Sequence, residues 1–152
     1  MRFSFYSEEK DYIGELLYIR DEHSFLYKPY NTNAGVSILI GGYTELDTIL
    51  ETSEVTHVSG FCHKNTWIIK SINVPNSKKG CLIAHFDKPP MKGTGIEYDR
   101  SLETYYDEEK QYICIGDYCI EDTDDCVEFA NNIIAVLRNG DLVAIWAKIK
   151  MV

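Results

Sequence analysis

The sequence predicts a mainly β protein, with a β-rich α+β fold as the alternative. Its antiparallel sheets are expected to form a sandwich or a half-barrel, with one or two short helices. Apolar and polar residues alternate with a period of two in the opening segment, residues 2–7, as in a half-buried strand. Short β-branched or aromatic runs then recur between turn residues along the whole chain. A length of 152 residues with 45% hydrophobic residues fits a single domain over 1–152.

The first half of the chain reads as a series of hairpins. Two apolar runs flank Arg20–His23, and two more flank residues 52–54, so each pair predicts strands joined by a short loop. The strands expected here cover residues 2–7, 13–19, 25–30, 36–41, 43–51, 55–62 and 66–74. The last of them runs into Pro75-Asn76-Ser77, which is a turn cluster.

The second half ends in the clearest pattern of the sequence. Strands are expected at residues 80–86 and 111–120, with a loop at 88–95 where two prolines and two glycines oppose regular structure. The segments 126–131, 132–138 and 141–149 predict an antiparallel three-stranded meander. Asn139-Gly140 favours a two-residue type I′ turn within it, because both central residues of that turn take positive φ.

Signals for helices are few. Residues 99–110 predict one short acidic helix, with Asp99 or Ser101 as the N-cap and Glu103 in the first turn. The start of residues 8–18 could also be helical. The expected total is about eight to ten strands, on the spacing of the turn signals.

The negative charge is concentrated in one segment. The chain carries a net charge of −9, yet residues 97–128 hold twelve acidic residues against Arg100 and Lys110, a net of −10. The remaining 120 residues are close to neutral, at +1, and residues 78–92 form a small basic stretch of +3. An acidic balance argues against binding nucleic acid or an anionic membrane, since both need Lys and Arg. It permits a basic protein partner.

Tyrosines are interleaved with the acidic residues of this segment. A charge run often does no more than keep a protein soluble, and that interpretation stays open. Tyrosine, however, is enriched at protein interfaces, where it offers contact area and a hydroxyl group. The candidate partner-binding residues are Glu103, Tyr105, Tyr106, Asp107, Glu108, Glu109, Tyr118, Glu121, Asp122, Asp124 and Asp125.

No motif predicts a cofactor, a metal or a catalytic centre. The chain has no glycine-rich phosphate loop, and His57, Cys62 and His63 lack zinc-finger spacing. Cys62 and His63 are adjacent on an expected strand, so their side chains point to opposite faces and cannot act together as nucleophile and base. The acids around Asp122 do not form a calcium loop, because the position that needs glycine is Val127.

The compartment follows from the cysteines and the N-terminus. Five cysteines, an odd number, favour a reducing environment over a disulfide scaffold. A cluster of charged residues, Glu8 to Asp11, follows Ser7 before an apolar signal region could form. No apolar run approaches the roughly 20 residues of a membrane helix. We therefore expect a cytoplasmic protein.

Two stretches resemble a known family. The segment Glu51-Thr52-Ser53-Glu54-Val55, followed by Val58-Ser59-Gly60-Phe61 and Trp67, resembles a strand–turn–strand of the small immunity proteins in bacterial polymorphic toxin and contact-dependent growth inhibition systems. The closing VEFANNIIAVLRNGDLVAIWAKIKMV looks like the C-terminal meander of the same proteins. The resemblance covers turns and core positions, and no family binding motif is transferred.

The resemblance implies a non-catalytic antitoxin that binds and neutralises a cognate toxin domain, commonly a basic nuclease. This expectation agrees with the separate charge argument, because a nuclease displays Lys and Arg to grip phosphates. Two alternatives stay open. One is a β-barrel or sandwich that binds a small ligand, and the other is an enzyme that uses Cys62, His63 or His85.

Overall fold

The computed structural model describes residues 1–152 and confirms a mainly β protein with almost no helix. Its only helical element is a 3-10 turn, η1 (Lys64–Thr66), and no helix is long and apolar enough to cross a bilayer. The strands are β1 (Arg2–Ser7), β2 (Glu15–Ile19), β3 (Ser24–Lys28), β4 (Ala34–Ile40), β5 (Thr44–Ile49), β6 (Glu54–Phe61), β7 (Ile68–Ile69), β8 (Lys78–His85), β9 (Thr94–Asp99), β10 (Thr104–Asp107), β11 (Tyr112–Gly116), β12 (Asp125–Ala130), β13 (Ile133–Arg138) and β14 (Asp141–Met151).

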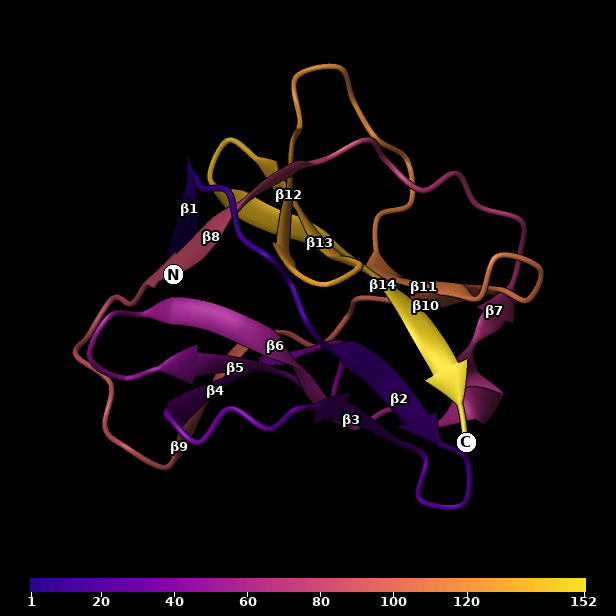
Figure 1. The fold of residues 1–152 in the computed structure, drawn as a ribbon, viewed down its shortest axis with the longest axis horizontal. Helices are drawn as coiled ribbons and strands as arrows, with labels where there is room; N and C mark the ends of the chain where they lie inside the picture. The colour runs from indigo at the N-terminus through magenta and orange to yellow at the C-terminus, as the bar shows by residue number, and fades with distance from the viewer.

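The fourteen strands belong to one mixed sheet that folds over on itself. Its pairings run from β8 through β12, β13, β14, β2, β3 and β6 and return to β8, so they close a ring of seven strands. Ten strand pairs are antiparallel. The other four, β7–β10, β8–β12, β2–β14 and β4–β9, are parallel and were not expected. Figure 1 shows two layers, with β10–β14 in one and β2–β6 in the other.

The main core lies between these two layers. Twenty-five buried residues form it, and the side chains of Tyr18, Ile38, Leu82 and Ile145 are at most 1% exposed. They come from both layers, which explains why so many strands show alternating burial, as in β4 and β5. Each large apolar side chain buried in this way stabilises the fold by roughly 1.5–3 kcal/mol.

The C-terminal meander is confirmed. β12, β13 and β14 pair antiparallel in sequence order. Asn139 and Gly140 have φ of 53° and 82°, as the favoured Asn-Gly turn requires. The hairpins β2–β3 and β5–β6 are confirmed as well.

The acidic helix expected over residues 99–110 is wrong. Residues Thr104–Asp107 form β10, which pairs with β11 and β7. The physical reason is a period-two pattern hidden by the charges: Thr104 and Tyr106 are buried, while Tyr105 between them is half-buried on the other face. The helical start expected within residues 8–18 is also wrong, because residues 8–14 are irregular and β2 follows.

Two expected strands prove much shorter. Within residues 66–74 only β7 is a strand, and from 111–120 only β11 remains. Residues 70–77, which we call the strap, instead cross the outer face of the layer formed by β10–β14. There Ile72 is buried in a second cluster with Cys114, Ile134, Val136, Ala144 and Trp146, and Val74 packs against it. This layer is therefore covered on both faces.

Candidate functional site

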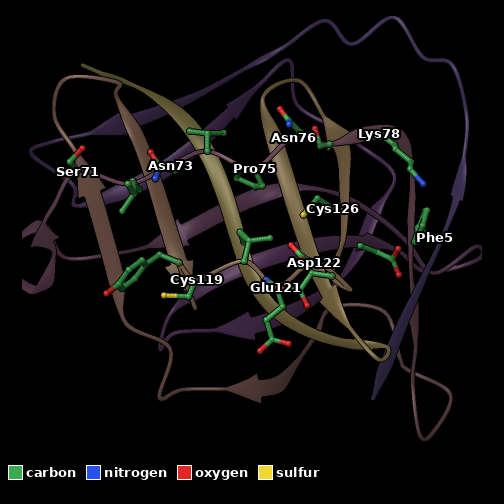
Figure 2. Close-up of a pocket in the computed structure, with 17 residues that line it drawn as sticks. Phe5, Ser71, Asn73, Pro75, Asn76, Lys78, Cys119, Glu121, Asp122 and Cys126 are labelled. Carbon is green, nitrogen blue, oxygen red and sulfur yellow. The ribbon is translucent and has the colours of Figure 1, made fainter.

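A groove of about 970 Å³ is the largest hollow on the surface. It lies on the strap side of the sheet, between the strap and the loop that joins β11 to β12. Figure 2 shows Ser71, Asn73, Pro75 and Asn76 along one wall and Cys119, Glu121 and Asp122 along the other. Its apolar floor includes Ile72, Val74, Tyr118 and Cys126, all of which belong to or pack against the second cluster.

The wall made by the strap is anchored at Ile72. The Asp107 carboxylate accepts the amide N–H of Ile72 at 3.0 Å, and the ammonium of Lys110 donates to the Ile72 carbonyl. Asp107 also accepts the amide N–H groups of Glu109 and Lys110 at 3.1 and 3.0 Å. These backbone donors, that of Lys110 foremost, hold the pKa of Asp107 below its usual range. Asp107 thus joins the β10–β11 turn to the strap.

The opposite wall, residues 117–124, is folded around Arg138 of β13. The guanidinium donates to both oxygens of Asp124, each at 2.9 Å, and to Asp117 at 3.2 Å. It also donates to the carbonyl of Cys119 and lies 3.4 Å from the carboxylate of Glu121. These bonds from Arg138 hold the pKa of Asp124 below its usual range. One arginine therefore holds a loop that would otherwise repel itself.

Two tyrosines meet beside the groove. The rings of Tyr105 and Tyr118 are in edge contact, with centroids 4.7 Å apart, and the ammonium of Lys70 lies 4.7 Å from the Tyr118 ring. The hydroxyl of Tyr105 donates to Glu103 at 2.8 Å, which raises the pKa of Tyr105 to about 12. Glu103, Tyr105 and Tyr118 therefore form one contiguous polar and aromatic patch.

Three of the eleven predicted partner-binding residues are not on the surface. Tyr106 is 5% exposed and belongs to the main core, and Asp107 is 4% exposed beneath the strap. The side chain of Asp124 is fully buried against Arg138. Sequence alone treats Asp107 and Asp124 as solvated, but hydrogen bonds turn their carboxylates inward, and Tyr106 is buried by packing in the main core. They support the fold.

The other eight lie at the surface, in two groups. Glu121, Asp122, Asp125 and Tyr118 line the groove, and Tyr105 and Glu103 adjoin Tyr118. Glu108 and Glu109 are exposed in the β10–β11 turn and do not line it. We call the exposed or half-buried members, namely Glu103, Tyr105, Glu108, Glu109, Tyr118, Glu121, Asp122 and Asp125, the acidic–tyrosine surface.

Sequence reasoning missed the strap as a wall of the site. Residues 71–78 line the groove beside an acidic loop that lies over forty positions further along the chain. The turn cluster Pro75-Asn76-Ser77 was the available signal, since it marks backbone outside the sheet. Arg138 was missed too, because nothing in the sequence pairs it with residues 117–124.

The cysteine and histidine candidates lie elsewhere and apart. Cys62 is buried and its sulfur accepts the indole N–H of Trp67, whereas the ring of His63 stacks on His23 with centroids 3.9 Å apart. His85 is bonded to Ser4 at 2.6 Å. His57 is bonded to Asp47 at 3.0 Å. All five cysteines are free thiols.

The groove is chemically suited to cations. Its lining includes Lys78 as the only basic residue, against Glu121, Asp122, Asp124 and Asp125. Arg138 neutralises Asp124, and the other three carboxylates are open to solvent. An apolar floor next to exposed carboxylates can take both the aliphatic stem and the charged head of Lys or Arg. No known protein family model matches this chain, and a search of curated proteins finds no relative of it.

Proposed function

We propose that this chain is a non-catalytic immunity protein that acts in the cytoplasm and neutralises a cognate basic toxin domain, with a nuclease as the expected toxin. The observation that supports this most is the acidic–tyrosine surface, in which Glu121, Asp122 and Asp125 border an open groove beside Tyr118. A toxin surface that binds phosphate groups is positively charged, so the negatively charged acidic–tyrosine surface is complementary to it and can cover it. Tyr105 and Tyr118 supply the aromatic anchors that hot spots favour.

Charge and anchors have separate effects on binding. Complementary charge mainly raises the association rate, by about 10–10³-fold at low salt. Buried anchors lower the dissociation rate and so set the lifetime of the complex. A tight inhibitor of this design needs both, and they are adjacent here, because Tyr118 lines the same groove as Glu121 and Asp122.

The experiment is co-expression with the toxin domain encoded beside the gene, read as growth rescue and as co-purification. The test variant reverses Glu121, Asp122 and Asp125 to Lys, and the matched control reverses Glu9, Asp21 and Glu51, which are exposed and form no ion pair. We expect the test variant to associate with the toxin domain more slowly than the wild type and with less dependence on salt. The control variant should keep most of the wild-type association rate and growth rescue. Equal association rates for the two variants would refute the charge argument, and a neighbouring toxin that kills despite co-expression would refute the function.

A small-ligand site is the second candidate, because the groove falls within the size range of about 300–1,000 Å³ typical of such sites. It predicts thermal stabilisation by a low-molecular-weight cation, and this stabilisation would be lost in the variant with Glu121, Asp122 and Asp125 reversed.

A further inference from the structure

The strap carries a row of unused backbone hydrogen-bonding groups. None of the backbone–backbone hydrogen bonds of the protein involves residues 73–77, and no side chain bonds to their backbone either. The residues just before this stretch are fixed by hydrogen bonds, because the backbone N–H of Lys70 donates to the Tyr106 carbonyl at 3.0 Å and that of Ile72 donates to the Asp107 carboxylate. The free stretch is thus held in place at its start, while Asn73, Val74, Asn76 and Ser77 keep an unpaired amide N–H and carbonyl and Pro75 keeps an unpaired carbonyl alone.

These unpaired residues, 73–77, form one wall of the groove. Residues 73–77 all line the groove, and Glu121 and Asp122 lie across it from Asn73, Pro75 and Asn76 (Figure 2). A stretch of five residues spans at most roughly 16–18 Å, which is the length of a short strand. Backbone pairing with an incoming strand provides affinity, and pockets for alternate side chains provide specificity.

We propose that the groove binds an extended segment of the partner protein, which pairs its backbone with strap residues 73–77. Successive side chains of such a segment point to opposite faces. Small or apolar residues at every second position then meet the floor at Val74 and Cys126, and Lys or Arg between them reach the carboxylates of Glu121, Asp122 and Asp125. The segment that fits is therefore an alternating basic strand.

The inference rests on the proposed function, because it specifies which part of a basic partner the acidic–tyrosine surface receives. Charge complementarity selects a basic segment over an acidic or neutral one, since Lys78 is the only base in the lining. Proline at an incoming position would remove a backbone donor, so the segment is expected to lack it.

The probe is a blocked octapeptide of four Thr–Lys repeats, and its control is the same peptide N-methylated at two adjacent central residues. Methylation keeps the charge and removes two backbone donors. Binding is measured by fluorescence anisotropy at low salt, and amide shifts are followed for Asn73, Val74, Asn76 and Ser77. We expect the parent peptide to bind about tenfold more tightly than the methylated one, and to lose about tenfold in the Glu121/Asp122/Asp125→Lys variant. The Glu9/Asp21/Glu51→Lys variant should bind it within about twofold of wild type.

Shifts confined to the four strap amides, together with the loss on methylation, support the proposal. Equal affinity for the parent and methylated peptides, no binding of the parent peptide, or shifts that miss the strap would each overturn it. These failures leave the proposed function standing if the co-expressed toxin is still neutralised. A toxin that escapes neutralisation, with the peptide results intact, refutes the function and not the peptide site.

Discussion

The bond between Arg138 and Asp124 offers the most direct test of how the acidic loop is held. A double-mutant cycle compares Arg138→Met, Asp124→Asn and the two changes combined. Methionine keeps much of the aliphatic length and removes the guanidinium, while asparagine keeps the shape and removes the charge. Because Arg138 also contacts Asp117 and Glu121, only the cycle isolates the part that belongs to Asp124.

The magnitude follows from the geometry of this pair. Two charge-assisted hydrogen bonds of 2.9 Å join the guanidinium to the fully buried Asp124 carboxylate. Removing one partner of a buried ion pair costs about 3–5 kcal/mol. The side chain of Arg138 is 24% exposed, so water can reach the vacated position. We therefore expect Arg138→Met to lower the free energy of unfolding by about 2–3 kcal/mol and Asp124→Asn by about 1–2 kcal/mol, with a coupling of roughly 1.5 kcal/mol.

The assay is urea unfolding followed by tryptophan fluorescence, repeated between pH 7 and pH 3. Arg138 lowers the pKa of Asp124 in the folded protein. The resulting stability is complete above the unfolded-state pKa of about 3.9 and is lost as the pH falls through the lower folded pKa. The deficit of Arg138→Met should therefore shrink below about pH 4. A coupling under about 0.5 kcal/mol, or a deficit that does not change with pH, would refute the reasoning.

Three further predictions concern packing and exposure. Thr48 and Thr44 are both buried in β5, but the hydroxyl of Thr48 has no hydrogen-bond partner, while that of Thr44 donates to the Phe61 carbonyl. Thr48→Val should raise the free energy of unfolding by about 1 kcal/mol, which is about 2–4 °C in Tm. Thr44→Val should lower the free energy of unfolding by about 0.5–1.5 kcal/mol. Equal effects would contradict the assignment. Ile72→Ala should cost about 2–4 kcal/mol in urea unfolding, because Ile72 is 2% exposed, whereas Ile69→Ala, at a 54% exposed residue, should cost under about 0.5 kcal/mol. Cys119 is exposed and Cys114 is buried, with burial raising the pKa of the Cys114 thiol, so a thiol reagent at pH 8 should label Cys119 first; rapid labelling of Cys114 in the folded protein would contradict the structure.

The sequence predicts local structure well wherever a turn has its own chemistry. Asn139-Gly140 fixes the β13–β14 turn, and the loops at residues 20–23 and 52–54 join the expected hairpins. Parallel pairs carry no comparable signal, because their partners are joined by no short turn. The pairing of β14 with β2 links residues more than 130 positions apart. That is why the closed ring of strands could not be predicted.

Charge misled the sequence reasoning in one region and guided it in another. A run of acids around Tyr105 and Tyr106 looks like the exposed face of a helix. The residues are in fact a strand, in which Thr104 and Tyr106 are buried and Tyr105 between them is half-buried. The concentration of charge between residues 97 and 128 did lead to the groove, since four of the acids there line it. Which acids face the solvent depends on Arg138 and on the amide groups near Asp107, and both are contacts that only the folded chain creates.

The way the acidic loop is built bears on how it could bind. Five acids lie between residues 117 and 125, and a loop with that charge would spread apart in water if nothing held it. Arg138 offsets this repulsion at Asp124 and Asp117 by hydrogen bonds to both carboxylates. The exposed carboxylate of Glu121 lies 3.4 Å from the Arg138 guanidinium and is only partly neutralised. Asp122 and Asp125 make no ion pair. The loop is thus ordered by its inner acids, and its outer acids stay charged and exposed. A partner that brings Lys or Arg to them meets a surface whose ordering entropy has already been lost on folding, and such preorganisation increases affinity without adding contacts.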